Sequence, residues 1–190
     1  MTAGFTKRSE RLVHQGHVIS LAVGTFAGPR GEEFTRDIVH HPGAVSIVPV
    51  DGDEVILVRQ YRAALDDLVL EIPAGKRDVQ DEPPEETARR EIVEEIGMRA
   101  GRVELLAEFY NSPGFCDEHS FVFIGLDLEE AELDLQGVEE EHMTIERVKL
   151  DETLGMISRA EIIDAKTIIG LTLALERLRG PSGLLSGKPG

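Results

Sequence analysis

The stretch from Gly75 to Met98 reads GKRDVQDEPPEETARREIVEEIGM and predicts a loop followed by a helix. Proline suits the first turn of a helix, where its missing N–H costs nothing, so Pro83 and Pro84 mark the start. The residues that follow are mostly good helix formers, and Gly97 stands where a left-handed C-terminal cap is expected. We therefore expect a helix of about three turns that ends just before Gly97.

The faces of this helix differ in chemistry. Apolar residues recur at helical spacing and predict a stripe that faces the core: Ala88, Ile92 and Ile96. Glu91, Glu94 and Glu95 cluster elsewhere, where like charges repel and where the C-terminal end of the helix dipole disfavours anions. A divalent cation would remove this penalty, because Mg²⁺ takes hard oxygen ligands and shares itself with substrate phosphates. A solvated acidic face, the commoner explanation of a charge run, fits this cluster poorly.

The run Arg90–Met98 resembles the second half of the Nudix hydrolase signature, G-x5-E-x7-R-E-U-x-E-E-x-G-U, where U is bulky and apolar. Glu82 is followed by seven residues and then Arg90, as the pattern requires. Six residues instead of five separate Gly75 from Glu82, and the extra one falls in a loop, where insertions are tolerated. The resemblance implies an α+β fold, an α/β/α sandwich with a Nudix-type mixed sheet, preceded by an N-terminal antiparallel strand element.

The composition limits the class of protein. The 190 residues suffice for one domain with a sizeable core, and the net charge of −16 opposes nonspecific binding to nucleic acid or anionic membranes. No apolar run approaches the roughly 18 residues of a membrane span, and the N-terminus lacks the apolar segment of a signal peptide. The single cysteine, Cys116, excludes an intrachain disulfide and suits a reducing compartment. We therefore expect a cytoplasmic protein.

The remaining sequence predicts strands around this helix. Residues 1–40 predict a strand-rich element, residues 41–179 the Nudix domain, and the Gly-, Pro- and Ser-rich residues 180–190 a flexible tail. Strands are expected at Arg11–Val13, Val18–Phe26, Phe34–His40, Ala44–Val50, Glu54–Arg59, Leu68–Ile72, Val103–Tyr110, His119–Leu128 and Met143–Leu150. A short helix is expected at Asp151–Ile157. Ser158 and Glu161 form a capping-box pattern that opens a longer helix, to about residue 179.

Further segments are similar to the ADP-ribose pyrophosphatase branch of the family: Gln60-Tyr61-Arg62, Glu71-Ile72-Pro73-Ala74-Gly75, and an S-P-G segment at Ser112-Pro113-Gly114. The resemblance implies substrate contacts for Arg62, Arg36, Pro113 and Gly114. A guanidinium suits this role because its planar fork binds phosphate oxygens in pairs. From local sequence alone, a salt bridge of Arg62 with Asp66 or Asp67 is equally expected, and Pro113 is typical of a simple turn.

The resemblance also implies roles for the acidic residues. Glu91 and Glu95 would be the main metal ligands, joined by the Ala74 carbonyl, with Glu94 and Glu141 as further candidates and Arg90 orienting the carboxylates. Mg²⁺ is the expected cofactor, with Mn²⁺ as its substitute. The run Glu139-Glu140-Glu141 is similar to the loop that supplies the general base, and alignment favours Glu139. A solvated acidic loop is the alternative, and the choice among the three glutamates stays open.

The implied reaction is Mg²⁺-dependent hydrolysis of the pyrophosphate bond of ADP-ribose to AMP and ribose 5-phosphate, by a homodimer. The same chemistry on GDP-mannose, a flavin dinucleotide or a dinucleoside polyphosphate is the alternative, because the signature fixes the cleavage and not the group beyond the diphosphate. A nucleotide sensor without catalysis is a second alternative, but the retained glutamates count against it. An acidic interaction domain is a third, and it would show no thermal shift with Mg²⁺ and nucleotide.

Overall fold

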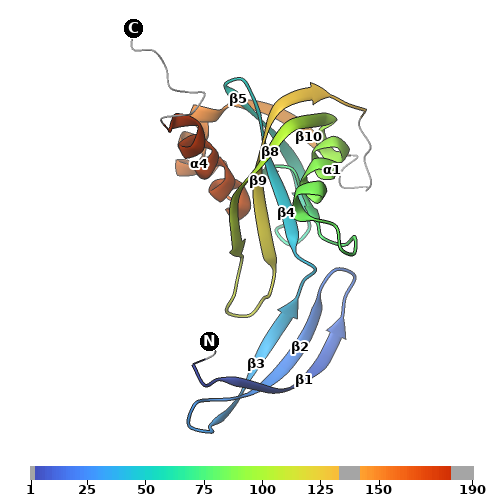
Figure 1. Ribbon diagram of the computed structural model, residues 1–190, viewed down its shortest axis with the longest axis vertical. Coiled ribbons are helices and arrows are strands. Elements are labelled where there is room, and N and C mark those ends of the chain that lie inside the picture. The colour runs from blue at the N-terminus through green and yellow to red at the C-terminus, as the bar shows by residue number, and fades with distance from the viewer. Residues whose placement is uncertain (1–2, 133–141, 181–190) are drawn as a thin grey trace. The chain divides into compact units, whose positions relative to one another are not determined.

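The computed structural model describes residues 3–132 and 142–180, which fall into two compact units (Figure 1). The N-terminal unit comprises Met1–Gly43 and Phe109–His119, and the sandwich unit comprises Ala44–Glu108 and Ser120–Gly190. The segment 109–119 therefore groups with the N-terminal strands, although it lies within the range 41–179 expected for the main domain.

The N-terminal unit is built on an antiparallel sheet of order β1-β2-β3, as expected for this part of the chain. Its strands are β1 (Thr6–Gln15), β2 (Ser20–Ala27) and β3 (Glu33–His40). The strand expected at Arg11–Val13 lies inside β1, but its expected extent was too short, because β1 begins at Thr6 and ends at Gln15. Every residue of β1 is exposed, so no alternation of apolar and polar side chains marks its extent in the sequence.

The segment 109–119 joins this unit through both backbone and side chains. Val39 N–H donates to the Phe115 carbonyl at 2.7 Å, and Asp117 N–H donates to the Val39 carbonyl at 3.1 Å. The His40 imidazole lies 2.5 Å from Asp117 Oδ2 and 3.0 Å from Glu10 Oε1. The hydrogen bond to Asp117 raises the pKa of His40; burial opposes this shift, and Glu10 adds to it. His40 thus connects β1, β3 and the segment.

The sandwich unit contains a mixed sheet with the strand order β10-β5-β4-β9-β8, in which β6 also pairs with β5 and β7 with β4. Its strands are β4 (Ala44–Asp51), β5 (Glu54–Arg62), β6 (Asp67–Glu71), β7 (Ala74–Lys76), β8 (Met98–Tyr110), β9 (His119–Glu130) and β10 (Thr144–Lys149). The β4–β9 pair is parallel, whereas β4–β7, β5–β6 and β5–β10 are antiparallel. The sequence did not predict β7, because three residues are too few to show a period.

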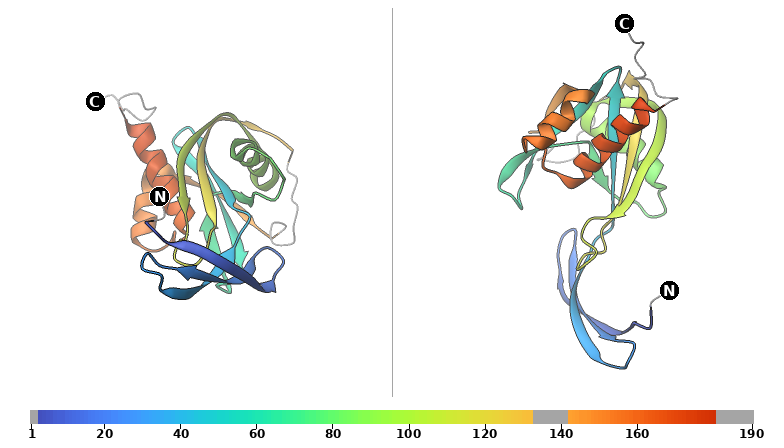
Figure 2. Two further views of the ribbon diagram at one scale, coloured as in Figure 1. Left: turned by 60° about the horizontal axis from the view of Figure 1, so that its bottom comes forward. Right: turned by 90° about the vertical axis from the view of Figure 1, so that its left-hand side faces the viewer.

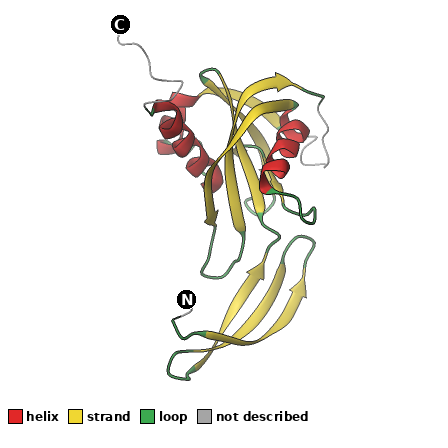
Figure 3. Cartoon of the chain, viewed as in Figure 1, coloured by secondary structure: helices red, strands yellow, loops and turns green. Residues whose placement is uncertain are grey.

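Helices cover both sides of this sheet, α1 (Pro84–Ile96) on one side and α4 (Ala165–Arg179) on the other (Figures 1 and 2). The 3₁₀ helix η1 (Leu150–Glu152) and helix α3 (Thr153–Ser158) precede α4. This is the expected α/β/α arrangement (Figure 3). No helix in the described part of the chain is both long and apolar enough to cross a membrane.

Helix α1 has the predicted ends and the predicted buried stripe. Gly97 has φ 62° and ψ 34°, the left-handed cap that was expected. The apolar stripe belongs to a buried cluster with residues of β4, β5 and β9: Val45, Ile47, Ile56, Val58, Ala88, Ile92, Ile96 and Phe123. The register of α1 on the sheet therefore follows from its apolar stripe, and the same register fixes where its glutamates lie.

Helix α4 begins later than predicted. Ser158 is the last residue of α3, and Glu161 pairs with Arg159 at 2.7 Å instead of closing a capping box. Asp164 caps α4 in its place, because its Oδ2 accepts from Thr167 N–H at 2.9 Å. The expected start at Ser158 was therefore wrong, and residues 166 and 167 lie in the first turn of α4.

Candidate active site

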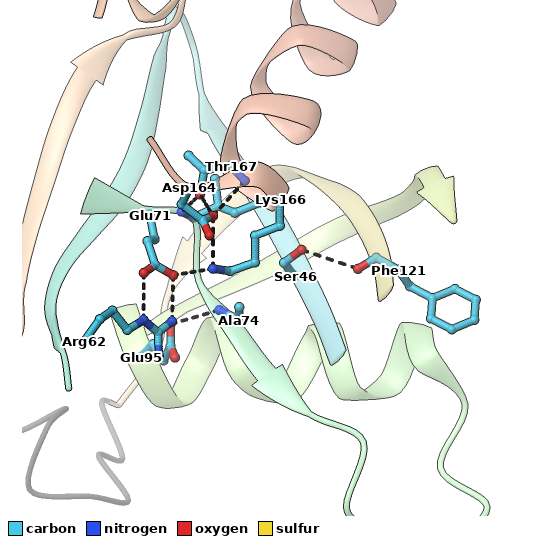
Figure 4. Close-up of polar contacts among 10 residues, drawn as sticks. Ser46, Arg62, Glu71, Ala74, Glu95, Phe121, Asp164, Lys166 and Thr167 are labelled. Atoms are coloured by element: carbon cyan, nitrogen blue, oxygen red, sulfur yellow. Dashed lines mark hydrogen bonds and ion pairs between the residues drawn. The ribbon is translucent and has the colours of Figure 1, made fainter. Parts of the chain in front are cut away.

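Two glutamates of α1 are buried where the helix meets β7. The exposed fractions are 8% for Glu91 and 4% for Glu95. Ala74 N–H donates to Glu95 Oε2 at 3.1 Å (Figure 4), and a Cβ atom on Gly75 would overlap the Glu91 carboxylate. A residue without a side chain is needed there for the backbone to approach the helix so closely. Both carboxylates are thus held against one short strand.

Arg90 holds the acidic groups around it. Its Nη1 lies 2.8 Å from Glu91 Oε1 and 2.8 Å from Glu94 Oε2, and its Nη2 lies 3.4 Å from Glu82 Oε2. Burial alone would lower the pKa of Arg90, but the three carboxylates outweigh it and raise that pKa. Glu82 also accepts from the Thr87 hydroxyl at 2.8 Å, so the extra loop residue does not carry it away from the helix. These contacts would allow Arg90 to orient the carboxylates, and that role stays a prediction.

The donor atoms at α1 and β7 suit a hard divalent cation. Among residues 3–132 and 142–180, no three His, Cys, Asp or Glu side chains gather closely enough to form a complete metal site. Nevertheless, two buried carboxylates face a strand whose backbone comes close because Gly75 leaves room. Oxygen donors of this kind fit Mg²⁺. Glu91, Glu95 and the Ala74 carbonyl stay the predicted main ligands and Glu94 a further candidate; Arg90 contacts Glu91 and Glu94 alike.

The Arg62 guanidinium forms a bidentate contact with a buried glutamate, Glu71. Its Nε and Nη2 donate to Glu71 Oε1 and Oε2 at 2.7 and 2.6 Å, and the exposed fraction of the Glu71 side chain is 2% (Figure 4). The partners considered from local sequence, Asp66 and Asp67, are not the ones found. Asp66 accepts from the Tyr61 hydroxyl at 2.8 Å. Glu71 takes the guanidinium because a buried carboxylate needs a cation, whereas an exposed one is hydrated.

Lys166 is a second cation on Glu71, and it was not among the predicted site residues. Its Nζ contacts Glu71 Oε2 and lies 3.0 Å from Asp164 Oδ2 (Figure 4). Burial would raise the pKa of Glu71, but the hydrogen bond from Arg62 and the charge of Lys166 outweigh it, so that pKa is lowered. The pKa of Arg62 is raised, first by its bond to Glu71 and further by the charges of Asp164 and Glu95. Arg62 therefore lies close enough to one carboxylate of α1, Glu95, to interact with its charge.

Three further predicted site residues, Arg36, Pro113 and Gly114, belong to the N-terminal unit. The Arg36 guanidinium lies 4.8 Å from the centre of the Phe34 ring. Pro113 and Gly114 are the central residues of a turn closed by Phe115 N–H and the Ser112 carbonyl at 3.1 Å. Their contacts with substrate stay predictions.

The acidic run that was predicted to hold the base lies outside the described residues. It comprises Glu139, Glu140 and Glu141. Glu139 as the general base and Glu141 as a further metal ligand therefore stay predictions.

The α/β/α sandwich and the glutamate-bearing face of α1 together define a Nudix-type protein. A model of the NUDIX domain matches residues 40–169, and the chain belongs to the Nudix family. It is 39% identical over 156 residues to the ADP-ribose pyrophosphatase of Bacillus subtilis (strain 168), covering 82% of this chain and 84% of that protein. It is 38% identical over 162 residues to the methanol dehydrogenase activator of Bacillus methanolicus, covering 84% and 86%. A crystal structure of an ADP compounds hydrolase superposes with a TM-score of 0.82 at 22% identity, covering 94% of this chain and 96% of that one.

Gly75→Ala should disturb the site through packing alone. The added Cβ would overlap the Glu91 carboxylate, so the side chain or the strand must shift. We expect weaker Mg²⁺ binding by calorimetry, because the Glu91 carboxylate must move, and a fall in the free energy of unfolding of about 1 kcal/mol, the low end of the usual cost of overpacking. Gly180→Ala is the matched control, because its Cβ would meet its nearest neighbours at an ordinary 3.7 Å. Equal behaviour of the two variants would contradict the close approach of β7 to Glu91.

Glu71→Ala should destabilise the sandwich unit by about 3 kcal/mol in urea unfolding, because it leaves two cations without their buried partner. Removing one partner of a buried ion pair usually costs about 3–5 kcal/mol, and we expect the lower value here because solvent screens Arg62. The lowered pKa of Glu71 means that the wild type keeps this stabilisation above pH 4.5 and loses it as the pH falls through the folded-state pKa. Asp53→Ala, which removes an exposed pair with Lys149, should leave the unfolding midpoint nearly unchanged.

Proposed function

We propose that the protein hydrolyses the pyrophosphate bond of ADP-ribose, giving AMP and ribose 5-phosphate, with Mg²⁺ held by Glu91 and Glu95. The observation that carries this proposal is that α1 bears two buried carboxylates and that Arg62 lies close enough to one of them, Glu95, to interact with its charge. Carboxylates suit the cation, and a guanidinium suits the diphosphate. The name of the Bacillus subtilis relative supports ADP-ribose as the substrate.

The chemical difficulty is that water must approach a phosphorus atom surrounded by negative oxygens. A bound Mg²⁺ supplies neutralising charge and acidifies water. Arg62 would bind phosphate oxygens and stabilise the charge that shifts onto them, and Arg36 is the predicted second arginine. Arg90 would keep Glu91 and Glu94 in place through its two 2.8 Å contacts. Glu139 would take the proton from the attacking water, while the P–O bond to the leaving phosphate breaks.

We propose that the protein is a homodimer and that the N-terminal unit forms the contact between the two copies. We also propose that the protein is cytoplasmic. The edge strand β1 exposes apolar side chains, with exposed fractions of 56% for Leu12 and 47% for Val13. An exposed edge strand with apolar side chains favours association. The single cysteine suits a reducing compartment. Light scattering of the purified protein tests the dimer, and a monomer at micromolar concentration would contradict it.

The deciding experiment mixes the protein with ADP-ribose and Mg²⁺, with and without chelator, and follows the products by chromatography. Chelator-sensitive AMP with equimolar ribose 5-phosphate is the expected result. GDP-mannose, a flavin dinucleotide and a dinucleoside polyphosphate form the comparison panel. A higher kcat/KM on one of these would overturn the substrate assignment. A thermal shift with nucleotide but no product from any of them would point to the sensor instead.

A further inference from the structure

The contact between Lys166 and Glu71 has no role in the functional scheme above, although it is buried beside the proposed diphosphate site. The exposed fractions of the two side chains are 17% and 2%. An ion pair at such a position is costly to bury, and stability alone seldom requires it. Lys166 also comes from the opposite side of the sheet, on the first turn of α4. The position of Lys166 therefore suggests that it helps to arrange the groups next to it, Glu71 and Arg62.

The geometry shows that Glu71 is shared between two cations. Arg62 donates to both carboxylate oxygens, and Lys166 contacts Oε2. Asp164, the other acidic neighbour of Lys166, accepts from Thr167 N–H and Oγ1 at 2.9 and 2.6 Å. That carboxylate also lies at the N-terminus of α4, where the helix dipole stabilises it. Lys166 therefore divides its charge between Glu71 and Asp164.

This sharing changes what Arg62 can offer an anion. A carboxylate that binds one arginine cancels most of that arginine's charge, whereas a carboxylate that also contacts a second cation cancels less of it. Arg62 uses Nε and Nη2 for Glu71, and within the described residues its Nη1 has no hydrogen-bond acceptor. The exposed fraction of its side chain is 38%, so the free N–H groups are open to a ligand.

We propose that Lys166 is a positioning residue for diphosphate binding: by sharing Glu71, it leaves more of the positive charge of Arg62 uncancelled and fixes the direction of its free N–H groups. The inference rests on the proposed function and deepens it. Lys166 itself does not touch substrate in this scheme. Its effect should be confined to ligands that carry the diphosphate.

The test compares Lys166→Met with Lys166→Arg, and Lys149→Met serves as the matched control because its ion pair with Asp53 is exposed. Binding of ADP and of adenosine is measured by calorimetry with Mg²⁺, beside the kinetics with ADP-ribose. For Lys166→Met we expect about a tenfold weaker affinity for ADP and a similar rise in KM, since hydrogen bonds to charged groups are worth 1.5 kcal/mol or more. We expect kcat within about threefold and an unchanged affinity for adenosine. Lys166→Arg should restore ADP binding.

The outcomes separate this inference from the proposed function. No turnover of ADP-ribose by the wild type rejects the substrate, whereas the ADP and adenosine affinities still decide the role of Lys166. Equal ADP affinity in wild type and Lys166→Met overturns the inference, as does equal weakening of adenosine or a wild type that does not bind ADP. If Lys166→Met does not fold, Lys166→Gln replaces it, with the same weakening of ADP binding expected.

Discussion

Glu95→Gln should lower kcat/KM for ADP-ribose by at least about a hundredfold, because loss of groups that merely support a metal ligand already costs 10- to 100-fold. The amide has the size of the carboxylate, and its oxygen can still accept from Ala74 N–H, which lies 3.1 Å from Glu95 Oε2. Packing should therefore survive. What disappears is the negative charge that a hard cation requires. The assay is steady-state AMP formation over a range of Mg²⁺ concentrations.

A matched substitution on the same helix distinguishes the loss of a carboxylate at the proposed metal site from the loss of any negative charge on α1. Glu86 lies in the first turn of α1 and is exposed. Glu86→Gln should therefore keep nearly the wild-type rate. Circular dichroism and the unfolding midpoint should agree among the three proteins. Wild-type activity in folded Glu95→Gln would remove Glu95 from the metal site and leave the proposed chemistry without its main ligand.

Glu139→Gln should lower kcat by about a hundredfold or more while Mg²⁺ binding stays unchanged, since a general base contributes typically 10²–10⁴ in rate. The physical reason is that neutral water is a poor nucleophile, and an amide cannot accept its proton. The acidic limb of the pH profile of kcat should flatten in the variant, because that limb reports protonation of the base. Single-turnover rates across pH, beside calorimetric titration with Mg²⁺, check both statements.

Neighbouring glutamates provide the control for this prediction. Glu140→Gln and Glu141→Gln remove one charge from the same acidic run. Glu140→Gln should keep nearly the wild-type kcat, and Glu141→Gln should at most weaken Mg²⁺ binding. A larger loss of kcat in either variant than in Glu139→Gln would move the base to that residue. Unlike Glu95→Gln, the base variant should bind metal normally, so the two kinds of defect can be told apart.

The sequence predicted α1 and its glutamates well because the determinants are local. Proline at the start, glycine at the end and the spacing of the apolar residues set the register, and the positions of Glu91 and Glu95 follow from it. Helix α4 was harder, because Ser158 and Asp164 are both good capping residues. The chain uses Asp164, since Ala160 has a positive φ of 57° that interrupts a helix started at Ser158.

The network around Glu71 could not be predicted from spacing. Glu71 and Lys166 are 95 positions apart, and Arg62 has closer acidic neighbours in the sequence than Glu71. The one local signal was a charged residue within an apolar strand, VLEI at residues 69–72. Such a residue must find a partner when it is buried. That signal indicates that Glu71 needs a cationic partner, but only the fold determines which cation forms the ion pair.

The consecutive residues Ile72, Pro73 and Ala74, which lead from β6 into the start of β7, form hydrogen bonds with three different elements. Ile72 N–H donates to the Thr167 hydroxyl of α4, the Pro73 carbonyl accepts from Ile47 of β4, and Ala74 N–H donates to Glu95 of α1. The two helices on opposite sides of the sheet are thus joined through three residues of chain. Linked equilibria are reciprocal. If a cation bound at α1 stabilises the docking of α4 on the sheet, the docking of α4 strengthens the binding of that cation by the same free energy. If α1 binds a divalent cation as proposed, the docking of α4 on the far side of the sheet would contribute to the affinity for that cation.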